Sequence, residues 1–224
     1  MTLTEAIHLE PLTELALKRY TLSEVDGGYK LEALQETAVK DVQFIVDLIN
    51  VYSDPESFKT DVFESYSMSI ILDYLKKTHA FYTDRLLPKM EMAVKSLQDT
   101  FEDHPIAQVL DRFFTHYRNE FLEHIELEER RLFPYASTLY DGLISYDYSV
   151  QEFTSHHNHD LEDHLQDVLY MIESEFPEVA RSFAYRSFSI LLEQFRADLR
   201  IHHLIEEHVF LLKVKNLEST LGHA

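Results

Sequence analysis

The chain has no cysteine, which excludes disulfides, thiolate metal ligands and cysteine nucleophiles. Only four glycines occur among its 224 residues, and so few helix breakers favour long helices. No run approaches the roughly 18 uncharged apolar residues that a membrane-spanning helix needs. The first residues also lack the basic and apolar regions of a signal peptide. The sequence therefore predicts a cytoplasmic protein that does not act at a membrane.

Basic residues are also scarce. The sequence holds 20 Lys and Arg against 40 Asp and Glu, a formal net charge of −20. A surface of this charge repels nucleic acid and attracts cations. We therefore expect no nucleic-acid partner.

The pattern of apolar residues predicts an all-α protein. We expect a small helical region over residues 1–64, without any chemistry-bearing pattern, and an up-down-up-down four-helix bundle over 65–224. The bundle helices are predicted over residues 65–97 (with a kink at Pro88), 105–139, 149–176 and 177–217. Ser149-Val150-Gln151-Glu152 has the form of a capping box at the start of the third helix.

Two copies of a His-x-x-x-Glu pattern stand on the apolar seams of the second and fourth helices. His124 and Glu128 form the first copy, and His202 and Glu206 form the second. Side chains four residues apart lie on one helix face, one turn apart. The seams of the first and third helices carry His79 and His157. In an up-down-up-down bundle these six side chains fall at one level of the interior.

The choice of register leaves alternatives. His203 and Glu207 have the same spacing, but their row continues through Arg200 and Arg196, so we expect a solvated face there. In the third helix His159 is the alternative to His157. Glu126 and Glu129 fall off the seam of the second helix.

The two carboxylates predict a metal site. Burying two carboxylates without counter-charge costs several kcal/mol each, and the seams carry no Lys or Arg at that level. Two metal cations would supply the charge. Nitrogen-rich ligation with bridging carboxylates suits iron, and manganese is the alternative. Six protein ligands leave room for an oxo or hydroxo bridge and for a position open to dioxygen or nitric oxide.

These motifs resemble those of hemerythrin-like domains, and among them the repair-of-iron-centres proteins. The resemblance covers about residues 65–217, on the motifs Thr78 to Tyr82 with Leu87-Pro88, Glu123 to Pro134, and Asp198 to Val209. It implies a non-haem di-iron centre in which His79, His124, His157 and His202 are terminal ligands and Glu128 and Glu206 bridge the ions. Members of the repair family commonly carry adjacent cysteines in an N-terminal domain, which this chain lacks.

The resemblance implies a role in nitrosative or oxidative stress, through repair of iron–sulfur clusters by supplying iron or handling nitric oxide. Iron–sulfur proteins would then be partners. The alternatives are a reversible dioxygen or nitric oxide carrier or sensor, a redox enzyme, and a metal-free helical interaction protein. The pattern leaves open whether the activity is enzymatic and whether the chain is a monomer or a homodimer.

Overall fold

The computed structural model describes residues 12–20, 42–143, 148–156 and 161–222, and every regular element in these ranges is helical. This confirms the prediction of an all-α protein for the part described. A 3-10 turn, η3 (Pro55–Ser57), precedes α4. The α-helices are α2 (Thr13–Lys18), α3 (Val42–Ser53), α4 (Thr60–Glu64), α5 (Met68–Phe81), α6 (Leu87–Thr100), α7 (Pro105–Leu127), α8 (Phe133–Tyr140), α9 (Val150–His156), α10 (Leu161–Glu175), α11 (Pro177–Ala180), α12 (Phe183–Ile205) and α13 (Leu211–Leu221).

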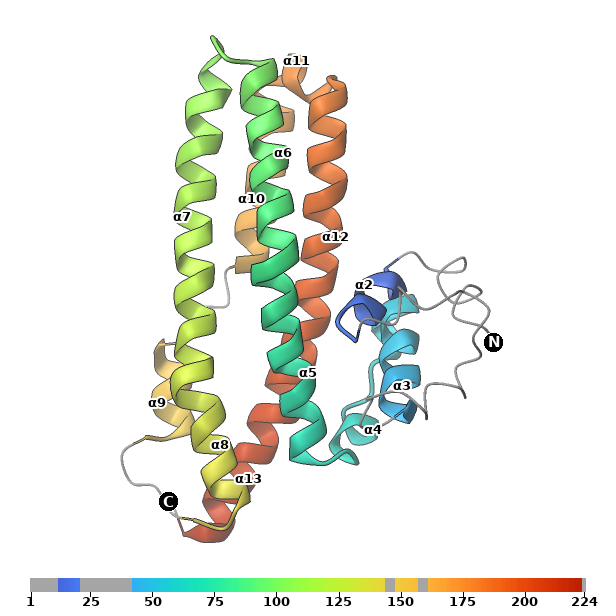
Figure 1. Cartoon of the computed structure of the whole chain (residues 1–224), viewed down its shortest axis with the longest axis vertical. Coiled ribbons are helices and arrows are strands. Elements are labelled where there is room, and N and C mark those ends of the chain that lie inside the picture. Colours follow the sequence, from blue (N-terminus) through green and yellow to red (C-terminus); the bar gives the residue numbers. More distant parts are fainter. Residues whose placement is uncertain (1–11, 21–41, 144–147, 157–160, 223–224) are drawn as a thin grey trace.

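The long helical segments are α5 with α6, α7 with α8, α10, and α12 with α13. They lie side by side and pack in a ring (Figure 1). Helix α6 contacts α7 and α12, and α10 contacts the same two neighbours. Successive segments run in opposite directions, so α5 lies at the same end of the molecule as α8 and α13 (Figure 1). The start of the segment formed by α5 and α6 therefore lies level with the ends of the segments that finish in α8 and α13 (Figure 1).

Among the described residues, three π-helical turns interrupt the long segments. In each turn the first residue after it donates its backbone N–H to the carbonyl five residues earlier, where an α-helix would use the carbonyl four residues earlier. These turns are η4 (Tyr82–Leu86), η5 (Glu128–Leu132) and η6 (Glu206–Phe210). Two of them begin at the predicted ligands Glu128 and Glu206, and π turns are frequent at functional sites.

Proline accounts for two of the π turns. Pro88 and Pro134 stand in the first turn of the α-helices that follow η4 and η5. A proline has no N–H to donate, and its ring crowds the preceding turn, so a widened turn just before it relieves the conflict. The predicted kink at Pro88 is therefore a π turn over the residues before it. Leu212 occupies the matching position after η6, so the third turn forms without proline.

The predicted start of the fourth bundle helix is wrong. Pro177 opens only the short helix α11, and the long helix α12 begins at Phe183. Arg181 and Ser182 separate them, and Ser182 Oγ accepts a hydrogen bond from the N–H of Tyr185 at 3.0 Å, as an N-cap does. The predicted N-cap of the third helix is confirmed, because Ser149 Oγ accepts from the N–H of Glu152 at 3.1 Å.

The N-terminal helices share one hydrophobic core with the long segments. Leu17 of α2 and Phe44 of α3 belong to the same buried cluster as residues of α5, α7 and α12. Helices α2, α3 and α4 lie beside α5 and α12 (Figure 1). No helix in the described ranges is both long enough and apolar enough to cross a bilayer.

Candidate metal centre

Three of the predicted ligands converge from three different segments. His79 comes from α5, Glu128 from the start of η5 and His202 from α12, and each offers a ligand atom within 4.8 Å of the others. His79 Nε2 lies 3.1 Å from Glu128 Oε2. The rings of His79 and His202 are 5.2 Å apart between centroids. Two nitrogens and one oxygen thus face a common point.

A second group shares one member with the first. His124, Glu128 and Glu206 also offer ligand atoms within 4.8 Å of one another. His124 Nε2 lies 2.7 Å from Glu128 Oε1, and His202 Nε2 lies 3.6 Å from Glu206 Oε2. The two oxygens of Glu128 therefore face histidines on two different helices, one oxygen in each group.

Both carboxylates are buried, and their pKa values move in opposite directions. Glu128 and Glu206 are each 0 % exposed. Burial opposes the charge of Glu128, but His124 and His79 outweigh it and hold the pKa of this carboxyl well below its usual range. Burial, together with the neighbouring Glu128 carboxylate, raises the pKa of Glu206 well above its usual range. Two carboxylates this close cannot both be charged without a cation between them.

The pKa values of the buried histidines His79 and His202 also move in opposite directions. Burial lowers the pKa of His79, but hydrogen bonds with Glu128 and Glu129 outweigh it and raise the pKa to about 8. His202 lacks this help, so burial, reinforced by the charge of His79, puts its pKa well below the usual value. His202 is therefore a neutral imidazole, the form that binds a metal ion.

Glu129 fixes the orientation of one histidine. Its Oε1 lies 3.1 Å from His79 Nδ1 and accepts the hydrogen bond from that ring nitrogen. With a proton held on Nδ1 by Glu129, Nε2 is the nitrogen that gives up its proton to bind an ion at the common point. The sequence places Glu129 off the helix seam, yet Glu129 stands in the π turn η5 and reaches His79 from the solvent side. The side chain of Glu129 is 43 % exposed, whereas that of His79 is buried.

The structure brings together five of the six predicted ligands. These are His79, His124, Glu128, His202 and Glu206. His157 and its alternative His159 lie outside the described residues.

The expectation that His203 lies on a solvated face is wrong. The side chain is 9 % exposed, and its ring packs 6.4 Å from that of His124 and 5.8 Å from that of His202. Its neighbour Glu207 is half-buried. The ring of His124, on α7, therefore lies against this side of α12 and helps to cover it.

Comparison with protein-family models, with curated proteins and with solved structures gives no match in any of the three.

The donor atoms fit a pair of cations. Within the described part of the chain, neither oxygen of Glu206 accepts a hydrogen bond from a donor, and Nδ1 of His202 has no hydrogen-bond partner. Buried polar atoms normally have such partners, and metal ions are a common substitute. Three nitrogens and two carboxylates also match the donor types preferred by iron and manganese.

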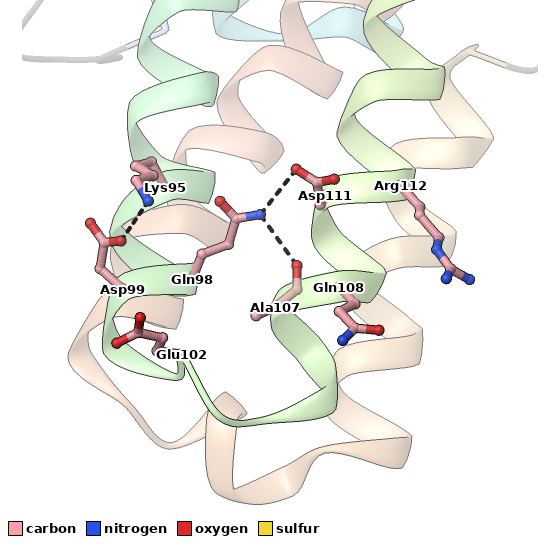
Figure 2. Close-up of a pocket in the computed structure, with 8 residues that line it drawn as sticks. All are labelled: Lys95, Gln98, Asp99, Glu102, Ala107, Gln108, Asp111 and Arg112. Atoms are coloured by element: carbon pink, nitrogen blue, oxygen red, sulfur yellow. Dashed lines mark hydrogen bonds and ion pairs between the residues drawn. The ribbon is translucent and has the colours of Figure 1, made fainter.

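A surface cleft away from the metal centre offers no comparable set of metal ligands. It lies at the turn between α6 and α7, and Gln98 of α6 bonds across it to α7 (Figure 2). Lys95 bonds Asp99 at 2.7 Å, and Gln98 donates to the carbonyl of Ala107 at 3.2 Å. The described residues that line the cleft include no histidine, and the cleft lies at the opposite end of the molecule from α5 and α8 (Figure 1).

Proposed function

We propose that this chain is a hemerythrin-like four-helix bundle with a non-haem di-iron centre, acting in the cytoplasm in nitrosative or oxidative stress. In this proposal the protein repairs iron–sulfur clusters, so its partners are iron–sulfur proteins and a small diatomic molecule such as nitric oxide or dioxygen.

One observation carries the metal part of the proposal. Glu128 is fully buried and belongs to both donor groups, with Oε1 facing His124 at 2.7 Å and Oε2 facing His79 at 3.1 Å. A carboxylate whose two oxygens face two separate sets of donors is arranged as a bridge between two ions. Paired-metal sites of helical bundles use carboxylates from facing helices in this way.

The residues divide between two metal positions. His79 and His202 with one oxygen of Glu128 would hold one ion, and His124 and Glu206 with the other oxygen would hold the second. Bound iron would supply redox chemistry and an open position for a small ligand. The chain's own part is to exclude water through the buried aromatic rings next to the ligands. Tyr82 packs against His202 at 5.8 Å and Phe133 stacks on His79 at 5.3 Å.

The link to iron–sulfur repair is carried by the resemblance of the motifs over about residues 65–217. The acidic surface is compatible with attraction of iron ions towards the chain. The same centre could instead bind dioxygen or nitric oxide reversibly, so the experiment has to separate the two functions.

Metal analysis and a visible spectrum of freshly purified protein test the centre. We expect about two irons per chain and near-ultraviolet absorption from an oxo-bridged pair, whereas manganese in the analysis would replace iron in the proposal. Glu206→Ala should lose most of the metal, and Glu207→Ala, its half-buried neighbour, should retain it. Equal loss in both variants, or no metal after anaerobic reconstitution, would refute the centre.

The repair function is tested by adding the loaded protein to a nitrosylated iron–sulfur enzyme. We expect the enzyme to regain activity faster than with the same amount of iron salt. Stable, reversible nitric oxide binding without any such recovery would replace repair by the carrier function.

A further inference from the structure

A guanidinium group from the N-terminal region lies in the interior beside the candidate metal centre. Arg19 follows α2 and its side chain is 0 % exposed. Its guanidinium carbon lies 5.1 Å from the ring centroid of Phe81 and 5.7 Å from that of Tyr82. The rings of Tyr52 and Tyr74 lie at 5.8 Å. A cation in such surroundings has to be held by specific partners.

The partners of Arg19 belong to two different long helices. Its Nε donates to Thr78 Oγ1 on α5 at 2.8 Å, and its Nη2 forms a hydrogen-bonded ion pair with Asp198 on α12. The hydroxyl of Tyr52, on α3, donates to the second oxygen of Asp198. All of these side chains are buried. Arg19 therefore joins α5 to α12 through two bonds whose directions are fixed by the planar guanidinium.

Each of these two bonds ends next to a candidate ligand. Thr78 directly precedes His79, and Asp198 lies one helical turn before His202 on the same face of α12. Tyr82, one turn after His79, packs on Arg19 and on the ring of His202. His79 and His202 are the two nitrogen donors of one group, whereas His124 and Glu206 of the other group are not joined by Arg19.

We infer that Arg19 is a positioning residue that sets the separation of His79 and His202, and thereby the affinity of one of the two metal positions. The inference rests on the proposed metal centre. It gives the N-terminal region a role in that centre: α2 and α3 supply Arg19 and Tyr52, which hold the two helices at the spacing that the ion needs.

The inference predicts an effect on one metal position only. Residues that orient ligands typically contribute about 10- to 100-fold to metal affinity. Loss of Arg19 should weaken the ion of His79 and His202 by about that factor and leave the ion of His124 and Glu206 in place. A merely structural role would weaken both positions together or neither.

Anaerobic iron(II) binding in competition with a chromophoric chelator, combined with Mössbauer spectra, measures the two positions separately. The variants are Arg19→Met, which removes both bonds, and Thr78→Val, which removes only the bond to α5 and keeps the volume of the side chain. His79→Gln identifies which binding step and which spectral component belong to its position. Arg200→Met is the matched control, since Arg200 also pairs the N-terminal region with α12, through Glu56 at 3.1 Å, but on the exposed surface.

We expect Arg19→Met and Thr78→Val to weaken the same step as His79→Gln, and Arg200→Met to bind both ions as the unaltered protein does. If Arg19→Met does not fold, Thr78→Val decides. Two ions bound with unchanged affinity in Thr78→Val, or an equal loss at both positions, would overturn the inference and leave the metal centre standing. An unaltered protein that binds no iron would refute the metal centre and the inference together.

Discussion

Glu206→Gln should stabilise the metal-free protein and weaken the metal-loaded one. In the metal-free protein, burial and the neighbouring Glu128 raise the pKa of Glu206 well above its ordinary value of 4.5. A group whose pKa is raised by folding stabilises the fold below its ordinary pKa, and this contribution is lost as the pH rises through the folded-state value. At pH 7 the folded protein therefore carries a cost that the unfolded chain, with Glu206 ionised, does not have.

The magnitude follows from the linkage. Keeping a proton at pH 7 on a group of ordinary pKa 4.5 costs at most about 3.5 kcal/mol, at about 1.4 kcal/mol per pH unit. Glutamine has nearly the same shape and no charge, so Glu206→Gln should raise the free energy of unfolding by up to that amount at pH 7. At pH 5 the gain should shrink to below about 1 kcal/mol, because the unfolded carboxyl is then close to its own pKa.

Urea unfolding of chelator-treated protein at both pH values measures the gain. Glu207→Gln, a change at the adjacent and half-buried residue, is the control and should show no such pH-dependent gain. With iron present the order of stability should reverse. A ligand that binds only the folded state stabilises it more the more tightly it binds, and Glu206→Gln removes a carboxylate ligand of the iron. A Glu206→Gln protein that is less stable than the unaltered one without metal at pH 7 would refute the reasoning.

Three further outcomes are expected. Iron(II) loading at pH 7 should release the proton held on Glu206 and about 0.9 proton from His79, whose pKa of about 8 keeps it mostly protonated, and calorimetry in two buffers of different ionisation enthalpy measures the total; no buffer dependence would contradict this. Arg19→Met should destabilise the metal-free protein by about 3 kcal/mol because Asp198 loses its buried cation, whereas Arg200→Met, from an exposed pair, should cost less than about 1 kcal/mol in the same urea assay. Glu129→Ala should weaken iron binding about 10-fold in chelator competition, since His79 loses the acceptor that orients its ring; unchanged affinity would remove Glu129 from the centre.

Local periodicity was sufficient to find the helices and most of the site. His124 with Glu128 and His202 with Glu206 stand four residues apart, a spacing that determines the shared face whatever the rest of the fold does. The seams also placed His79 correctly among the buried residues. The helix boundaries were less accurate, because the break at Ser182 and the three π turns depend on which carbonyls find donors locally. The spacing of apolar residues along the chain carries little information about these local hydrogen bonds.

The residues around the ligands were not predictable in the same way. Arg19 is separated from Asp198 by 179 positions, and no spacing rule connects the two. The row of Arg196 and Arg200 predicts an exposed His203, but the side chain is buried beside the ring of His124 on α7. Burial of this kind depends on neighbours from distant parts of the chain.

The sequence by itself therefore determined the helical class and the faces on which His79, His124, Glu128, His202 and Glu206 lie, because the geometry of a helix repeats every few residues. The tertiary structure decided that Glu128 belongs to both donor groups, that Glu129 orients His79 and that Arg19 joins α5 to α12. These relations are distances between segments, and only the packing of the whole chain sets them.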